Sequence, residues 1–95
     1  KIFEGIYCMY SGPNFETPAE INALKVIGGR AVGMSTVPEI IVAQHMKMSC
    51  FAISVITDLG VPGKIKKVTH EDVQKVAEST QPKLTSIIKC LIQEM

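Results

Sequence analysis

Three short runs of apolar and β-branched residues along the chain predict β-strands. The first, Gly5–Ser11, is apolar and aromatic and is closed by the turn residues Gly12-Pro13. The second, Ala31–Met34, is brief, and the third, Cys50–Ile56, is almost continuously apolar, as in a strand that is covered on both faces. We therefore expect strands near Ile6–Tyr10, Ala31–Gly33 and Cys50–Ile56.

Helices are expected between and after these strands, because hydroxyl residues stand where helices would begin. Thr17-Pro18-Ala19-Glu20 and Thr36-Val37-Pro38-Glu39 both have the spacing of a capping box, and Gly28-Gly29 is expected to end the first helix. Thr69-His70-Glu71-Asp72 predicts the start of a last, amphipathic helix, which Pro82 must kink or divide. The alternation of strands and helices predicts an α/β fold with a mostly parallel sheet between layers of helices.

The apolar content of the chain is high for a free-standing soluble domain of this length. The chain has 95 residues, of which 46% are hydrophobic and 20% charged, and its mean hydropathy is +0.23. A chain of this size forms one domain at most and buries only about 60–65% of its unfolded surface. We therefore expect the chain to oligomerise or to be a piece of something larger.

Charge and hydropathy argue against nucleic-acid and membrane partners. The chain has 10 Lys and Arg against 9 Asp and Glu, so there is no basic excess to neutralise phosphates. The only basic cluster, Lys64, Lys66 and Lys67, is typical of a solvated loop. The longest uncharged, mainly apolar run, Met48–Thr57, is far too short for a membrane span, and no signal peptide is expected at the start of the chain.

The three cysteines predict neither a metal site nor a disulfide framework. Cys8, Cys50 and Cys90 are odd in number and lack the close pairing of a zinc site. Each lies in an apolar run, so we interpret them as buried free thiols in a reducing, cytoplasmic environment.

Unusual residues follow each predicted strand, at the sheet edge where ligands of parallel α/β folds bind. They are Asn14, Phe15 and Glu16 after the first strand, Met34, Ser35 and Thr36 after the second, Thr57 and Asp58 after the third, and His70 at the start of the last helix. Taken singly, each has an ordinary explanation: a solvated carboxylate, a helix cap, a turn residue, a first-turn histidine or a core side chain. The residues alone predict an α/β piece that carries half of a polar pocket.

Four segments together resemble the C-terminal third of the trimeric purine nucleoside phosphorylases. They are EGIYCMYSGPNFETPAE at residues 4–20, AVGMSTVPE at 31–39, ISVITD at 53–58 and THEDV at 69–73. The resemblance implies a three-layer α/β sandwich, of which residues 1–95 are the C-terminal segment of a single domain. It also implies a cytoplasmic homotrimeric enzyme of purine salvage, in which inorganic phosphate is a co-substrate and no cofactor or metal is needed.

The same resemblance implies roles for individual residues. Glu16 is similar to the carboxylate that hydrogen-bonds the purine, and Phe15 to the ring that packs on it. Met34 resembles the residue beneath the ribose, His70 the histidine at the ribose 5′-hydroxyl, and Tyr7 a tyrosine near the ribose. Ser35 resembles a phosphate-binding hydroxyl at a helix start, where backbone N–H groups favour an anion.

Asp58 departs from the family pattern, in which an asparagine serves O6 and N7 of the purine. Negative charge moves onto the purine as the glycosidic bond breaks, and a donor at N7 stabilises it. An ionised aspartate has no donor, so it must be protonated or must bond an amino group. Phosphorolysis of adenosine or methylthioadenosine is therefore an alternative, although Glu16 resembles a carboxylate that the methylthioadenosine enzymes lack.

The glycine-rich phosphate loop of this family, with its phosphate-binding histidine and arginine, has no counterpart in the 95 residues. We therefore expect this segment alone to be inactive, whether it is a crop, a fragment or a truncated gene product. A third possibility is a non-catalytic relative that keeps only a binding or assembly surface.

Overall fold

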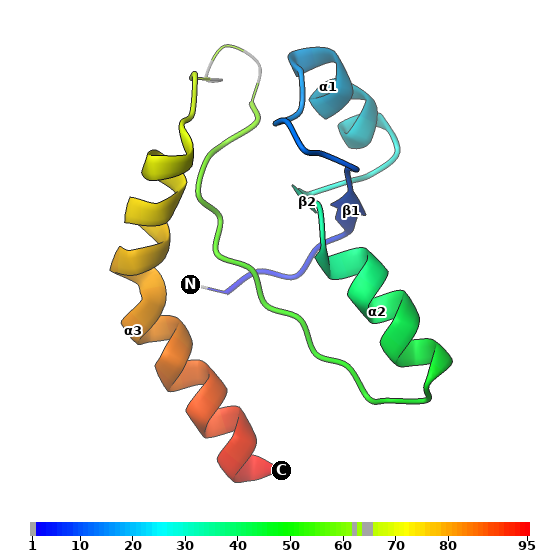
Figure 1. Ribbon diagram of the computed structural model, residues 1–95, viewed down its shortest axis with the longest axis vertical. Coiled ribbons are helices and arrows are strands. Elements are labelled where there is room, and N and C mark those ends of the chain that lie inside the picture. The colour runs from blue at the N-terminus through cyan, green and yellow to red at the C-terminus, as the bar shows by residue number, and fades with distance from the viewer. Residues whose placement is uncertain (1, 62, 64–65) are drawn as a thin grey trace. The chain divides into compact units, whose positions relative to one another are not determined.

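The computed structural model describes residues 2–61, 63 and 66–95, which form two compact units, Lys1–Ile53 and Ser54–Met95. The first unit contains two strands and two helices, and the second contains one long helix (Figure 1). The described chain is therefore a partial α/β fold with two parallel strands and three helices, which agrees with the predicted α/β class.

The two strands of the first unit pair in parallel. Strand β1, Tyr7–Met9, lies beside β2, Ala31–Gly33, with Tyr7 opposite Ala31. Backbone bonds continue the ladder at both ends, from the Arg30 N–H to the Ile6 carbonyl at 2.9 Å and from the Tyr10 N–H to the Gly33 carbonyl at 2.9 Å. Both predicted strands and their parallel pairing are confirmed, and the parallel register brings their carboxyl ends to the same edge.

Helix α1, Pro18–Val26, has the predicted capping box at its start. Thr17 is the N-cap, its side chain accepts from the Glu20 N–H, and Glu20 accepts in return from the Thr17 N–H. The helix ends where the two glycines predict, because Gly28 adopts φ 97° and its N–H bonds the Lys25 carbonyl.

Helix α2, Thr36–His45, contacts β1, but the capping box predicted for Thr36 is wrong. The N-cap is Ser35, in a helical conformation (φ −110°, ψ −32°), and it makes no side-chain cap bond. Thr36 is already the first helical residue, and its hydroxyl donates to Tyr7 Oη at 3.4 Å instead. The Thr36 hydroxyl, which the local pattern assigns to the cap, is therefore bonded to Tyr7 of β1, 29 residues away.

The strand predicted at Cys50–Ile56 is wrong, because residues 50–57 form no ladder in the described chain. The segment still alternates as a strand would: Ile53, Val55 and Thr57 are half-buried, whereas Ser54 and Ile56 are exposed. The only sheet in the described part of the chain is the β1–β2 pair. A central parallel strand needs neighbours on both sides, and residues 50–57 have none to pair with.

Helix α3, His70–Glu94, dominates the second unit and starts with a capping box of Thr69 and Asp72. Its half-buried residues recur at helical spacing and comprise Val73, Val76, Thr80, Leu84, Ile87, Ile88 and Leu91. Pro82 does not divide the helix, which is continuous in Figure 1. The hydroxyls of Ser79 and Thr80, three and two residues before Pro82, both donate to the Val76 carbonyl, at 2.8 and 2.9 Å.

None of the residues that the structure describes is fully buried, and many large apolar side chains are exposed. The three cysteines are free as expected, but Cys50 and Cys90 are exposed and Cys8 is half-buried, so the prediction of buried thiols is wrong. Lys66 and Lys67 are exposed, in keeping with a solvated loop, and Lys64 lies outside the described residues.

Candidate functional site

The loops that follow β1 and β2 touch each other at the carboxyl edge of the sheet. Gly12, which begins the turn after β1, has φ 69° and lies beneath the Met34 thioether. A Cβ on Gly12 would lie 2.6 Å from Met34 Sδ, so any larger residue would require the methionine side chain to shift. The structure therefore brings the loop of Phe15 and Glu16 into contact with the loop of Met34 and Ser35.

Tyr7 lies across the end of β2 in the same region. Its hydroxyl covers Gly33, where any Cβ would collide with it, and it accepts the hydrogen bond from Thr36. The Tyr7 ring is thus held between β2 and the start of α2. Tyr7 therefore lies next to Gly33 and Thr36, the residues on either side of Met34 and Ser35 in the chain.

Phe15 and Glu16 lie on the segment that leads into α1. The Phe15 side chain is 51% exposed, and its carbonyl accepts a hydrogen bond of 3.4 Å from Asn14 Nδ2. Glu16 is half-buried, directly before the Thr17 cap. The exposed Phe15 ring could stack on a flat heterocycle, and the Glu16 carboxylate beside it could accept hydrogen bonds from the N–H groups of that heterocycle.

Tyr10 and Glu20 form a short hydrogen bond behind this segment. The Tyr10 hydroxyl donates to Glu20 Oε1 at 2.6 Å, while Glu20 Oε2 accepts from the Thr17 N–H at 2.6 Å and hydroxyl at 2.8 Å. The Tyr10 bond, followed by those of Thr17, lowers the pKa of Glu20. The bond to Glu20, partial burial and the charges of Glu20 and Glu16 raise the pKa of Tyr10.

Ser35 is exposed at the start of α2, where its hydroxyl makes no cap bond. The first N–H groups of a helix have no intrahelical partners, and the helix dipole favours an anion there. Ser35 is thus the N-cap residue by position, as its ordinary explanation expects, but its hydroxyl is not used in a cap bond and could contribute a further donor to a phosphate.

Asp58 and His70 belong to the second unit. Asp58 Oδ1 accepts a hydrogen bond of 2.9 Å from the Thr57 hydroxyl, and His70 is the exposed first residue of α3. The Asp58 carboxylate therefore has one acceptor site occupied by its neighbour, and its second oxygen is available to a ligand. The structure does not bring Asp58 and His70 together by any hydrogen bond among the described residues.

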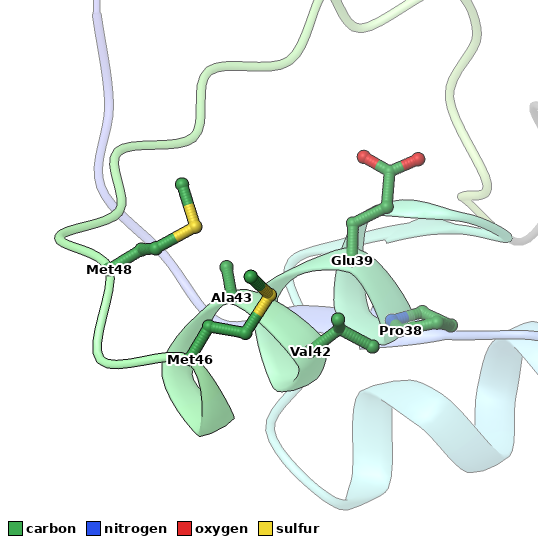
Figure 2. A pocket seen from close by; sticks show the side chains of 6 residues that line it. All are labelled: Pro38, Glu39, Val42, Ala43, Met46 and Met48. Carbon is green, nitrogen blue, oxygen red and sulfur yellow. The ribbon is translucent and has the colours of Figure 1, made fainter.

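Two hollows in the described part of the chain are lined by residues other than these. One is on the outer side of α2, where Figure 2 shows Pro38, Glu39, Val42, Ala43, Met46 and Met48 around it. The other lies along α3, lined by Val55 and residues of the helix from Gln74 to Leu84. Both are open and lack the convergent polar groups of a binding site.

Residues 2–61, 63 and 66–95 show neither a metal-binding cluster nor a membrane-spanning helix. No three His, Cys, Asp or Glu side chains are grouped so that they could hold a metal ion. No helix among them has the length and apolar character to cross a membrane.

Almost the whole chain is similar in sequence to known proteins. The sequence profile described as the phosphorylase superfamily matches residues 1–93. The chain belongs to the phosphorylase superfamily. Curated relatives include purine nucleoside phosphorylase 1 of Geobacillus stearothermophilus, 39% identical over 95 residues, and the purine nucleoside phosphorylases of Mus musculus, 40% over 97, and Bos taurus, 42% over 94.

These matches cover 97–100% of the chain but only 32–35% of the three relatives. The chain therefore spans about a third of the length of the curated phosphorylases that it matches. The resemblance stated from the sequence motifs is confirmed.

Sequence reasoning missed three contacts in and around the predicted site. Each contact joins residues that are 10 to 29 positions apart in the sequence: Tyr10 with Glu20, Gly12 with Met34, and Tyr7 with Thr36. The capping-box spacing identified Glu20, but nothing in that spacing indicates a third donor. The one available signal was Tyr10 itself, a polar-tipped ring at the exact end of an apolar run.

Proposed function

We propose that the protein containing this chain is a purine nucleoside phosphorylase. In this reaction phosphate attacks C1′ of a purine ribonucleoside or deoxyribonucleoside, the glycosidic bond breaks, and the free base and the pentose 1-phosphate are released. The observation that carries the proposal is the similarity of nearly the whole chain to curated purine nucleoside phosphorylases. The touching loops after β1 and β2 support it, because they carry the residues that resemble the purine, ribose and phosphate contacts.

We further propose that residues 1–95 form the C-terminal segment of a single three-layer α/β sandwich. The parallel β1–β2 pair and the strand-like alternation at residues 53–57 support this architecture. The exposed apolar side chains would then lie against the rest of the domain or against other subunits of a homotrimer. The enzyme would act in the cytoplasm, in purine salvage, with inorganic phosphate as co-substrate and without a cofactor.

Within this proposal each residue has a distinct task. Glu16 accepts hydrogen bonds from the purine N–H edge while Phe15 stacks on the base. Tyr7, Met34 and His70 contact the ribose, and Ser35 donates to phosphate at the start of α2. Charge-assisted bonds to the purine grow stronger as negative charge moves onto it, so they lower the barrier and do more than bind substrate.

Asp58 supports a second candidate, phosphorolysis of adenosine or methylthioadenosine. One oxygen of Asp58 accepts from the Thr57 hydroxyl. In the ionised carboxylate the second oxygen can only accept, so it suits the donor of a 6-amino group better than the acceptors O6 and N7. Glu16 favours the first candidate, because it resembles the carboxylate of the enzymes that act on inosine and guanosine.

The test is an assay of the complete protein with phosphate and, in turn, inosine, guanosine, adenosine and methylthioadenosine. We expect phosphate-dependent release of free base and pentose 1-phosphate, and none from the isolated 95-residue segment. Turnover of adenosine or methylthioadenosine alone would favour the second candidate. Phosphate binding without turnover of any nucleoside would favour a non-catalytic relative.

A further inference from the structure

The segment Ser11–Glu16 is anchored at both of its ends. At the first end, the Tyr10 N–H bonds the Gly33 carbonyl and so fixes Tyr10 to β2. At the second end, Thr17 is the N-cap of α1. The six residues between these anchors include both proposed purine contacts, so the positions of the anchors decide where Phe15 and Glu16 lie.

The Glu20 carboxylate joins the two anchors. Its Oε1 accepts from Tyr10 and its Oε2 accepts twice from Thr17, so both ends of the segment bond to one side chain. The link closes the segment into a loop, and the Tyr10 bond, at 2.6 Å to a carboxylate, has the length of a strong charge-assisted hydrogen bond.

The second capping box of the chain shows that a cap does not need such a link. Asp72 accepts from the Thr69 N–H at 3.1 Å and hydroxyl at 2.8 Å, as Glu20 does from Thr17, and no tyrosine joins that pair. The Tyr10 bond is therefore additional to what caps a helix.

Glu16 is electrostatically coupled to this link. Its charge acts on the Tyr10 hydroxyl and contributes to raising the pKa of Tyr10, so the two side chains lie within electrostatic reach of each other. The charges of Glu20 and Glu16 therefore both act on the Tyr10 phenol, which donates its hydrogen bond to Glu20.

We propose that Tyr10 is a positioning residue, which holds Glu16 and Phe15 against the purine through its hydrogen bond to Glu20. The inference rests on the proposed function, since it assigns the purine to this loop. Tyr10 itself does not touch the reacting atoms. Its effect should appear on the nucleoside and not on the phosphate, because Ser35 lies on the other loop.

The experiment compares Tyr10→Phe with Ser79→Ala in the complete protein. Tyr10→Phe keeps the ring and removes the hydroxyl, whereas Ser79→Ala removes a hydroxyl that donates at 2.8 Å on the exposed side of α3. For Tyr10→Phe we expect kcat/KM for the nucleoside to fall about tenfold, the loss expected when one charge-assisted bond is removed from a group that acts indirectly. The KM for phosphate should stay unchanged, and Ser79→Ala should change neither value.

Hydrogen exchange of the backbone amides supplies a readout that does not need catalysis. In Tyr10→Phe and in Glu20→Gln, the amides of residues 11–17 should exchange faster while those of α3 do not change. Unaltered exchange in residues 11–17, or an equal rise in the KM values for nucleoside and phosphate, would overturn the proposal. If the parent protein turned over no nucleoside, the proposed function would fail, and faster exchange would still support the Tyr10 link as a holder of this loop.

Discussion

Gly12→Ala should destabilise the protein more than Gly63→Ala, although both glycines have a left-handed backbone. The φ angles are 69° and 78°, and an L-residue in this region costs about 1–2 kcal/mol in either place. The surroundings differ: a Cβ on Gly63 would meet nothing within 4 Å, whereas one on Gly12 would lie 2.6 Å from Met34 Sδ. To regain an ordinary contact distance the sulfur must move by roughly 1 Å.

Overpacking of this kind costs about 1–3 kcal/mol, and the flexible methionine favours the lower end of that range. We therefore expect Gly12→Ala to lower the free energy of unfolding by about 2–3 kcal/mol and Gly63→Ala by about 1–2 kcal/mol. The KM for nucleoside should rise only in Gly12→Ala, because Met34 is the residue assigned to the ribose.

Urea unfolding of both variants, each alone and combined with Met34→Ala, measures the coupling. Removing the thioether takes away the obstacle, so the cost of Gly12→Ala should fall to that of Gly63→Ala when Met34 is absent. Equal costs for the two glycine variants, or a Gly12→Ala cost that Met34→Ala leaves unchanged, would refute the reasoning.

Four other predictions concern single side chains. Glu16→Gln should lower kcat/KM for inosine roughly a hundredfold, since a charge-assisted bond in a closed site contributes about 2–4 kcal/mol to the transition state; near-normal turnover would contradict the assignment. Ser35→Ala should raise the KM for phosphate more than that for nucleoside, with little change in melting temperature because Ser35 makes no cap bond; steady-state kinetics with each substrate varied decides this. Asp58→Asn should shift preference toward inosine and guanosine over adenosine, and an unchanged ratio of kcat/KM values would exclude Asp58 from base selection. Glu20 should make the protein acid-sensitive: its folded pKa lies below the ordinary 4.5, so its stabilisation is complete above that pH and is lost as pH falls through the folded pKa. Melting temperatures from pH 6 down to about 3 should therefore fall more steeply in the parent than in Glu20→Gln.

The elements that the sequence predicts correctly are those whose causes are local. The capping boxes at Thr17 and Thr69 and the turn at Gly28 depend on residues three or four positions apart, and all three form as expected. The same is true of the short apolar runs that become β1 and β2. Short-range chemistry is visible in a sequence because both partners stand within one turn.

The incorrect predictions depend on distant partners. Residues 53–57 keep the alternation of a strand, but residues 50–57 form no ladder in the described chain, because the partners of a strand come from elsewhere in a fold. By position either Ser35 or Thr36 can be the cap of α2. The Thr36 hydroxyl bonds that of Tyr7, 29 residues away, and Ser35 is the N-cap. The link between Tyr10 and Glu20 likewise follows no helical or strand period, so the sequence shows the tyrosine but not its partner.

The candidate site divides in the same way. Motifs predict the two loops of the first unit, and the structure brings these loops into contact through Gly12 and Met34. The roles of Asp58 and His70 stay predictions, because they depend on how a second unit meets the first.

The segment from Met48 to Thr57, of which residues 50–57 form no ladder in the described chain, also affects how the chain behaves during synthesis and purification. Its ten residues contain no charge, no proline and no glycine, and they are rich in β-branched side chains. Such segments stack readily into intermolecular cross-β aggregates whenever their backbone groups lack partners. Any nascent or proteolysed form that presents this segment without neighbouring strands would therefore tend to precipitate or to be retained by chaperones. Expression of soluble protein depends on how soon these ten residues are covered.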